Sequence, residues 1–223
     1  SIAVIGNRGA NFAIRESLKL GYSHQIWAVH PYLESLEGIK CFKNIKDLPE
    51  APDATFIAVN AESAIDIVSD LKSMGAGGAV LYASGFGEVG NEGLIRNQQL
   101  VKAADGMPLI GPNCYGFINY FDRVSVWSDQ VAGNQTNKGV AIICQSGTIG
   151  NTISFNHRSL PIGYIISLGN QAKIGIEDTI EYALKDKRVT AIGIYAEGFT
   201  SINKLIRVLK ISKEKKIPIA IVK

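Results

Sequence analysis

Short apolar segments rich in Ile and Val alternate with helix-forming segments along this chain, and the alternation constrains the fold more than any other feature. In the first half, strands are predicted over residues 2–5, 26–29, 55–59, 79–82 and 109–110, and helices over 12–20, 61–74 and 92–104. Strands that alternate with helices in this way form a parallel sheet with helices on both faces. The sequence therefore predicts an α/β fold.

A second alternation of the same kind occupies the rest of the chain. Strands are predicted over 140–144, 163–167, 191–195 and 217–222, and helices over 148–158, 176–185 and 201–214. Between the two halves, the extended segment 117–130 is expected to close the first unit, and the small polar residues 131–137 are interpreted as a linker. We therefore predict two domains, residues 1–133 and 134–223, which is natural for a chain of 223 residues.

Composition excludes several classes of protein. An apolar fraction of 46% against 19% charged residues is that of a soluble globular protein, and no apolar run reaches the length of a membrane span. The net charge of +3 is spread along the chain, so we expect neither a nucleic-acid nor a membrane partner. The three cysteines form no C-x-x-C pair, a usage typical of reduced thiols in the cytoplasm.

The first turn with chemical potential follows the first predicted strand. It consists of Gly6, Asn7, Arg8, Gly9, Ala10 and Asn11. Free N–H groups and the helix dipole at such a strand-to-helix turn form a cradle for an anion. The spacing is not G-x-G-x-x-G, and His30-Pro31 follows the second strand where an NAD site needs a carboxylate, so an NAD-dependent oxidoreductase is disfavoured. Taken alone, the turn fits an anion cradle and a plain connection equally well.

Three further turns follow predicted strands. Together with the turn at Gly6, turns 84–88 and 111–116 are expected to line one crevice, because ligands of doubly wound sheets bind beyond the carboxyl ends of the strands. In the third turn, Ser146 and Thr148 offer two hydroxyls at a helix start, which suits a phosphoryl group. Connection geometry would also explain each of the first two turns, and either hydroxyl could instead be a helix N-cap. Cys144 stands where a G-x-S-x-G nucleophile elbow needs glycine, so a serine hydrolase is disfavoured.

Glu197 ends a predicted strand in the second half. Its carboxylate is expected to face the same side as the turn at Ser146, because the carboxyl ends of parallel strands meet at one edge of a sheet. A glutamate at a strand end can alternatively cap the next helix. The residue alone does not decide between these two roles.

Taken together, these turns resemble those of the NDP-forming acyl-CoA synthetases, relatives of the succinyl-CoA synthetase α subunit. Residues 2–6 resemble the opening strand of their CoA-binding domain, 84–90 resemble "SAGFxEvG", 111–116 "GPNCxG", 144–148 "SQSG", 167–172 "SxGNxAD" and 195–198 "YxEG". The resemblance lies in the order and spacing of the six motifs. It implies a Rossmann-like CoA-binding domain followed by a flavodoxin-like CoA-ligase domain.

In that family a phosphohistidine carries phosphate from ATP to an acid, and CoA then displaces the phosphate. The resemblance implies that coenzyme A is bound by Gly6, Asn7, Arg8, Gly9, Ala10, Asn11, Pro31, Tyr32, Asn60, Ser84, Gly85, Phe86, Asn113 and Cys114. It implies that Ser146, Gly147 and Thr148 hold the phosphoryl group, with Asn170 as a further site residue. Glu197 would act catalytically by orienting the phosphorylated histidine. No metal site is predicted in this chain.

The chain also departs from the family. Asn7-Arg8 replaces small residues, Tyr32 follows Pro31 where a lysine is common, and Cys144 replaces a serine. These changes bear on CoA affinity rather than on the fold.

The phosphorylated histidine and the ATP-grasp domain of the family lie beyond Lys223, and His24, His30 and His157 match no catalytic position. His30 could still approach a ligand from its strand end. Because the chain also starts and stops directly on predicted strands, we expect a piece of a longer protein that is inactive alone. ATP, ADP and Mg²⁺ would bind only to an ATP-grasp domain or subunit, and the other partners would be CoA and a small carboxylic acid. A homo-oligomer stays open.

The alternative is a CoA-sensing module of the same two domains fused to a lysine acetyltransferase. The glutamate at position 197 favours the enzyme, since a sensor has no phosphohistidine to orient.

Overall fold

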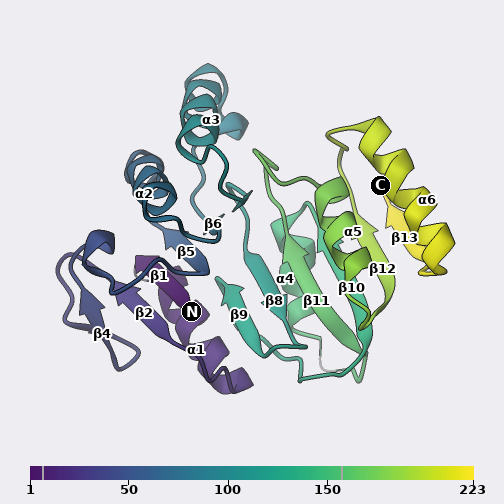
Figure 1. The fold of residues 1–223 in the computed structure, drawn as a ribbon, viewed down its shortest axis with the longest axis horizontal. Helices are drawn as coiled ribbons and strands as arrows, with labels where there is room; N and C mark the ends of the chain where they lie inside the picture. Colours follow the sequence, from purple (N-terminus) through teal and green to yellow (C-terminus); the bar gives the residue numbers. More distant parts are fainter. Residues whose placement is uncertain (7, 157) are drawn as a thin grey trace.

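The computed structural model describes residues 1–6, 8–156 and 158–223, apart from the side chain of Arg8. Asn7 and His157, both considered above, lie outside the described residues. The described chain forms two sheets with helices on both faces, which confirms the predicted α/β fold (Figure 1). Within it, no helix combines the length and apolar character needed to cross a membrane.

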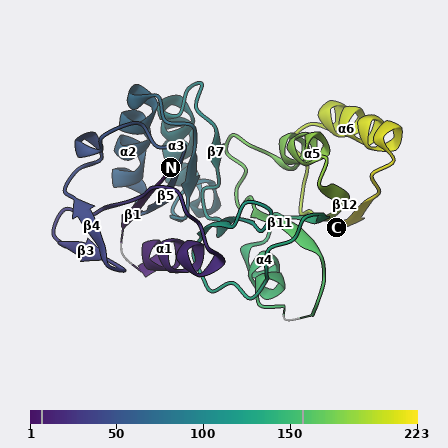
Figure 2. The same ribbon diagram turned by 60° about the horizontal axis from the view of Figure 1, so that its bottom comes forward.

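The first sheet has seven strands in the order β3-β4-β2-β1-β5-β6-β7. They are β1 (Ile2–Gly6), β2 (Ile26–Val29), β3 (Ser35–Leu36), β4 (Ile39–Phe42), β5 (Ala54–Ala58), β6 (Ala79–Leu81) and β7 (Leu109–Ile110). Helix α1 (Arg8–Leu20) covers one face, and α2 (Ala61–Met74) and α3 (Asn91–Ala103) cover the other (Figure 2). Alternation along β1 explains this, because Ile2 and Val4 join the core beneath α1 whereas Ala3 and Ile5 join the core beneath α2 and α3.

The second sheet has six strands in the order β13-β12-β10-β11-β8-β9. They are β8 (Gly116–Asn119), β9 (Val124–Trp127), β10 (Gly139–Cys144), β11 (Ile162–Ser167), β12 (Val189–Tyr195) and β13 (Ile219–Val222). Helix α4 (Gly147–Ser154) lies on the same side as α1, and α5 (Ile176–Lys185) and α6 (Ile202–Lys215) lie on the side of α2 and α3 (Figure 2). In both sheets the chain order reverses around a central strand, β1 or β10, where doubly wound folds bind ligands.

The segment 117–130 differs from the expectation. It forms the hairpin β8–β9, and β8 pairs antiparallel with β11 of the second sheet, with Tyr164 opposite Asn119. The hairpin also packs on α1, where the Ser17 hydroxyl donates to the Ser125 carbonyl at 2.9 Å and accepts the Ser125 N–H at 3.0 Å. The chain therefore passes from the first sheet to the second between β7 and β8. The hairpin joins them, and the division of the chain at residues 133 and 134 stays a prediction.

Smaller differences concern short elements. The strands β3 and β4 form a hairpin that the sequence analysis did not predict, and Glu37 and Gly38 turn it with positive φ angles of 47° and 80°. A short 3₁₀ helix, η1 (Ile45–Asp47), follows it, and a second, η2 (Gly87–Val89), precedes α3. Helix α1 begins at Arg8 rather than at the predicted residue 12, so residues 8–11 of the predicted glycine turn form the first turn of the helix.

Candidate functional site

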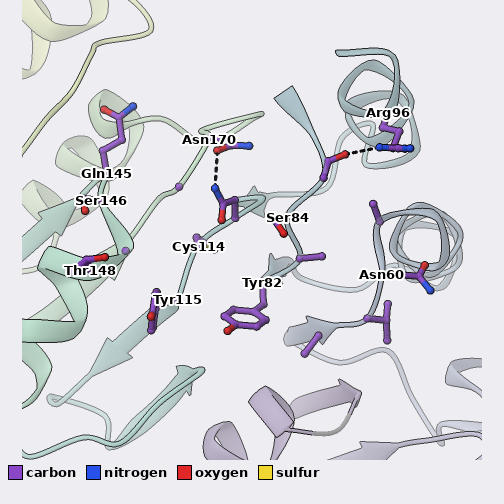
Figure 3. Close-up of a pocket in the computed structure, with 18 of the residues that line it drawn as sticks. Asn60, Tyr82, Ser84, Arg96, Cys114, Tyr115, Gln145, Ser146, Thr148 and Asn170 are labelled. Atoms are coloured by element: carbon purple, nitrogen blue, oxygen red, sulfur yellow. Dashed lines mark hydrogen bonds between the residues drawn. The ribbon is translucent and has the colours of Figure 1, made fainter. Parts of the chain in front are cut away.

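A cavity of about 900 Å³ lies between the two sheets, beyond the carboxyl ends of β5, β6, β10 and β12 (Figure 3). Candidate CoA-binding residues on its wall are Asn60, Ser84, Gly85, Asn113 and Cys114, and the other site candidates on its wall are Ser146, Gly147, Thr148, Asn170 and Glu197. Both sheets direct their strand ends to this space. The structure therefore brings the phosphate-binding candidates and five CoA-binding candidates into one crevice.

A second cavity of about 550 Å³ lies beyond the ends of β1 and β2. It is lined by Gly6, Pro31 and Tyr32, and also by His30, whose Nδ1 accepts hydrogen bonds from two backbone N–H groups that follow it. The residues Ala58, Val59 and Asn60 line both cavities. An elongated ligand can therefore reach from one cavity to the other across the end of β5.

The start of helix α4 faces the larger cavity. Ser146 occupies the N-cap position, but its side chain makes no capping hydrogen bond. The Thr148 side chain lines the same cavity. Consequently the first N–H groups of α4 and the positive end of its dipole are available to an anion. Gly147 is needed here because a Cβ on it would lie 2.7 Å from Cδ2 of the Tyr115 ring.

Glu197 is exposed on the wall of the cavity, in a loop that is held at both ends. Oε1 of Gln145 accepts the N–H groups of Glu197 and Gly198, each at 2.9 Å. Further along, the fully buried carboxylate of Glu177 accepts the Ser201 N–H at 2.7 Å. Ser201, not Glu197, caps helix α6. The carboxylate of Glu197 is therefore free of the capping role that its position also allowed.

Glu88 connects the loop after β6 of the first sheet to the loop after β11 of the second sheet, although the sequence analysis assigned it no role. One of its oxygens accepts the N–H groups of Gly85 and Phe86, and the other accepts the side-chain N–H of Asn170. Asn170 in turn accepts from Asn113 at 3.5 Å. Burial raises the pKa of Glu88, but these hydrogen bonds and one from its own backbone N–H outweigh burial and hold the pKa below its usual range. In the sequence, the only indication of a role for Glu88 was its position in the motif 84–90.

Three CoA-binding candidates have buried side chains. Phe86 is fully buried beneath α2 and α3, and its ring does not line the cavity. Ala10 is fully buried in the core beneath α1. Cys114 touches the cavity, but its thiol donates to the Leu81 carbonyl at 3.4 Å and burial raises its pKa to about 12. Phe86 and Ala10 can therefore offer a ligand only backbone groups.

The first glycine turn is described only in part, because Asn7 and the side chain of Arg8 lie outside the described residues. Gly9 packs closely on β5, since a Cβ on it would lie 3.5 Å from the Cβ of Ala58. Oδ1 of Asn11 is buried and has no hydrogen-bond partner within the described part of the chain. Asn60 caps α2 by accepting the Ser63 N–H at 2.9 Å, which leaves its amide NH₂ for a ligand.

The cavity also has residues that sequence reasoning missed. Tyr82 and Tyr115 form a T-shaped pair with ring centroids 6.2 Å apart, and both line the cavity (Figure 3). Arg96 lines it as well and donates to the Gly85 carbonyl at 3.0 Å. The available signals were that Tyr82 ends the predicted strand 79–82 and that Tyr115 lies in the motif 111–116, which follows a predicted strand.

Two family models match the two parts of the chain. Residues 1–120 match the family model "CoA binding domain", and residues 137–223 match "Succinyl-CoA ligase like flavodoxin domain". The acetate–CoA ligase [ADP-forming] II subunit alpha of Pyrococcus furiosus is 32% identical over 229 residues, which cover 99% of this chain and 49% of the relative. A trans-feruloyl-CoA synthase of an unknown prokaryotic organism is 32% identical over 210 residues, which cover 89% of this chain and 30% of the relative.

Solved structures agree with the sequence relatives. The apo form of the dinucleotide forming acetyl-coenzyme A synthetase 1 of Ca. Korarchaeum cryptofilum superposes with a TM-score of 0.89 at 27% identity, over 100% of this chain and 50% of that one. The chain thus spans half or less of the length of these three proteins. It belongs to the CoA binding domain family, continues into a succinyl-CoA ligase-like flavodoxin domain, and is homologous to the α subunits of ADP-forming acetate–CoA ligases.

Proposed function

We propose that this chain is the CoA-binding and phosphate-site portion of an ADP-forming acyl-CoA synthetase. The whole enzyme would convert an acid, CoA and ATP to acyl-CoA, ADP and phosphate through a phosphorylated histidine that this chain does not supply. The observation that carries the proposal is the cavity between the sheets, because CoA-binding and phosphate-binding candidates line it together.

The start of α4 would bind the phosphoryl group, and Glu197 would orient the histidine that carries it. A phosphoryl group at the start of α4 would accept hydrogen bonds from free backbone N–H groups and from the Ser146 and Thr148 hydroxyls. The Glu197 carboxylate lines the same cavity and would accept a ring N–H of an incoming histidine, which fixes the orientation of the ring. Gln145 supports this role by holding the backbone of Glu197.

CoA would extend across the two cavities. Gly6 and Tyr32 border the smaller cavity, and Asn60 borders both, so a long ligand would pass over the end of β5 toward the start of α4. ATP, ADP and Mg²⁺ would bind an ATP-grasp domain or subunit outside this chain, and the chain alone would not make acyl-CoA. We place the protein in the cytoplasm. The relatives reported above do not support the alternative of a CoA sensor fused to an acetyltransferase.

Calorimetric titration of the chain with CoA tests the proposal, with NADH as the control ligand. We expect CoA to bind and NADH not to bind. Tyr32→Ala should weaken CoA binding without affecting the fold, because this side chain is 86% exposed at the rim of the smaller cavity. Tyr182→Ala, on the exposed side of α5, is the matched control and should leave CoA binding unchanged. Binding of NADH without binding of CoA would overturn the proposal.

A further inference from the structure

An aromatic wall borders the start of helix α4. The Tyr115 ring lies against the first turn of the helix, where a Cβ on Gly147 would clash with it. Tyr115 also packs on the buried Trp127, with centroids 5.5 Å apart, and stands at 87° to the ring of Tyr82. Behind Tyr82, the buried Phe56 lies 6.1 Å away. Two tyrosine rings, each supported from behind by a buried aromatic ring, therefore border the cavity as an edge-to-face pair.

Tyr82 is the exposed member of this wall. It is 41% exposed and lines the cavity, whereas Phe56 and Trp127 are fully buried. Its hydroxyl makes no side-chain hydrogen bond within the described residues, so the ring is not held there by a polar partner. An aromatic ring that projects into a cavity offers a face for stacking, and aromatic pairs gain affinity beyond the area they bury. The side chain is thus placed for contact with a ligand.

The position of the wall points to the acid rather than to CoA phosphates. In the proposed function, the carboxyl carbon of the acid must meet a phosphoryl group near Ser146 and Thr148, and CoA must reach it from the side of Ser84. Tyr115 and Tyr82 lie between these two sides of the cavity (Figure 3). The remainder of the acid would therefore lie over the two rings.

Resting on the proposed function, we infer that this site selects an aromatic carboxylic acid, with Tyr82 as a specificity-determining residue. A planar group can stack on the open ring of Tyr82 beside the start of α4. A two-carbon acyl group is too small to cover both rings. The cavity of about 900 Å³ has room for an aryl group together with the end of CoA.

Calorimetry with CoA, acetyl-CoA and phenylacetyl-CoA tests the inference on the chain itself. We expect phenylacetyl-CoA to bind about tenfold more tightly than acetyl-CoA, the effect of about one aromatic stacking contact. Tyr82→Leu should remove most of this ratio and Tyr82→Phe should retain it, while Tyr182→Leu, the matched exposed tyrosine on α5, should not alter it.

The outcomes separate the inference from the proposed function. Equal binding of the two thioesters by the wild-type chain would overturn the inference, as would an unchanged ratio in a folded Tyr82→Leu variant. Both of these results are expected if the pantetheine arm of CoA, and not the acyl group, covers the two tyrosines. Absence of CoA binding would instead overturn the proposed function. The wild-type ratio decides the inference even where the leucine variant does not fold.

Discussion

Replacing Arg188 by methionine tests how firmly the hairpin β8–β9 is tied to the second sheet. The guanidinium donates to both oxygens of Asp122, in the hairpin turn, at 2.7 and 2.9 Å. It also donates to both oxygens of Asp186, at the end of α5, and lies 4.5 Å from the ring centroid of Phe121. Methionine keeps much of the apolar contact with Phe121 but leaves two neighbouring carboxylates without their cation.

The size of the effect follows from the electrostatics of Asp186. The hydrogen bonds of Arg188 are the main cause that lowers the pKa of Asp186 from 3.8 to about 2. A difference of this size is worth about 2 kcal/mol, at about 1.4 kcal/mol for each tenfold change in proton affinity. The Arg188 side chain is 37% exposed, so solvent screens part of it. We expect a loss of about 1–2 kcal/mol and a Tm lower by about 3–6 °C.

The loss must also depend on pH. Because the folded-state pKa of Asp186 is depressed, its contribution is present above about 3.8 and disappears as the pH falls through about 2. Urea unfolding, followed by Trp fluorescence, should show the full gap between wild type and Arg188→Met at about pH 7 and a narrowing gap toward about pH 3. Lys187→Met, at an exposed neighbour, is the control. A gap of less than about 0.3 kcal/mol, or one that does not narrow, would refute the reasoning.

Three further predictions concern packing, catalysis and the link between the units. Gly163→Ala should cost about 1–3 kcal/mol of unfolding free energy, because its Cβ would lie 1.9 Å from the Phe121 ring. Gly87→Ala meets no atom within 4 Å and should be nearly neutral; equal losses in the two variants would contradict the packing argument. In a synthetase that joins this chain to an ATP-grasp partner, Glu197→Gln should sharply reduce histidine phosphorylation, and undiminished phosphoenzyme would remove this residue from the mechanism. Glu88→Gln should speed hydrogen exchange of the two amides that donate to the carboxylate. Since the pKa of Glu88 is lowered, wild-type protection should hold above the ordinary carboxyl pKa and be lost as the pH falls through the lowered value, and pH-independent protection measured by NMR would count against the link.

The local elements were predictable from the sequence where local signals agree. Helices α2 and α5 have the predicted bounds, 61–74 and 176–185. In α2, apolar residues repeat at helical spacing between two clear end signals. Asn60 caps the start of the helix, and Gly75 ends it with a positive φ of 79°. The ends of the strands marked the turns that line the cavity, because parallel strands direct their carboxyl ends to one edge.

The tertiary structure alone decided which distant segments meet. Residues 117–130 carry a strand pattern, but only pairing with β11 places them in the second sheet. Phe86 sits in a glycine-rich turn that looked like a groove wall, yet its ring is in the core. The link from Glu88 to Asn170 joins residues 82 positions apart. Apolar periodicity and helix caps involve residues only a few positions apart, so they can be recognised in a short stretch of sequence. Contacts between distant segments depend instead on how the two folded sheets pack against each other.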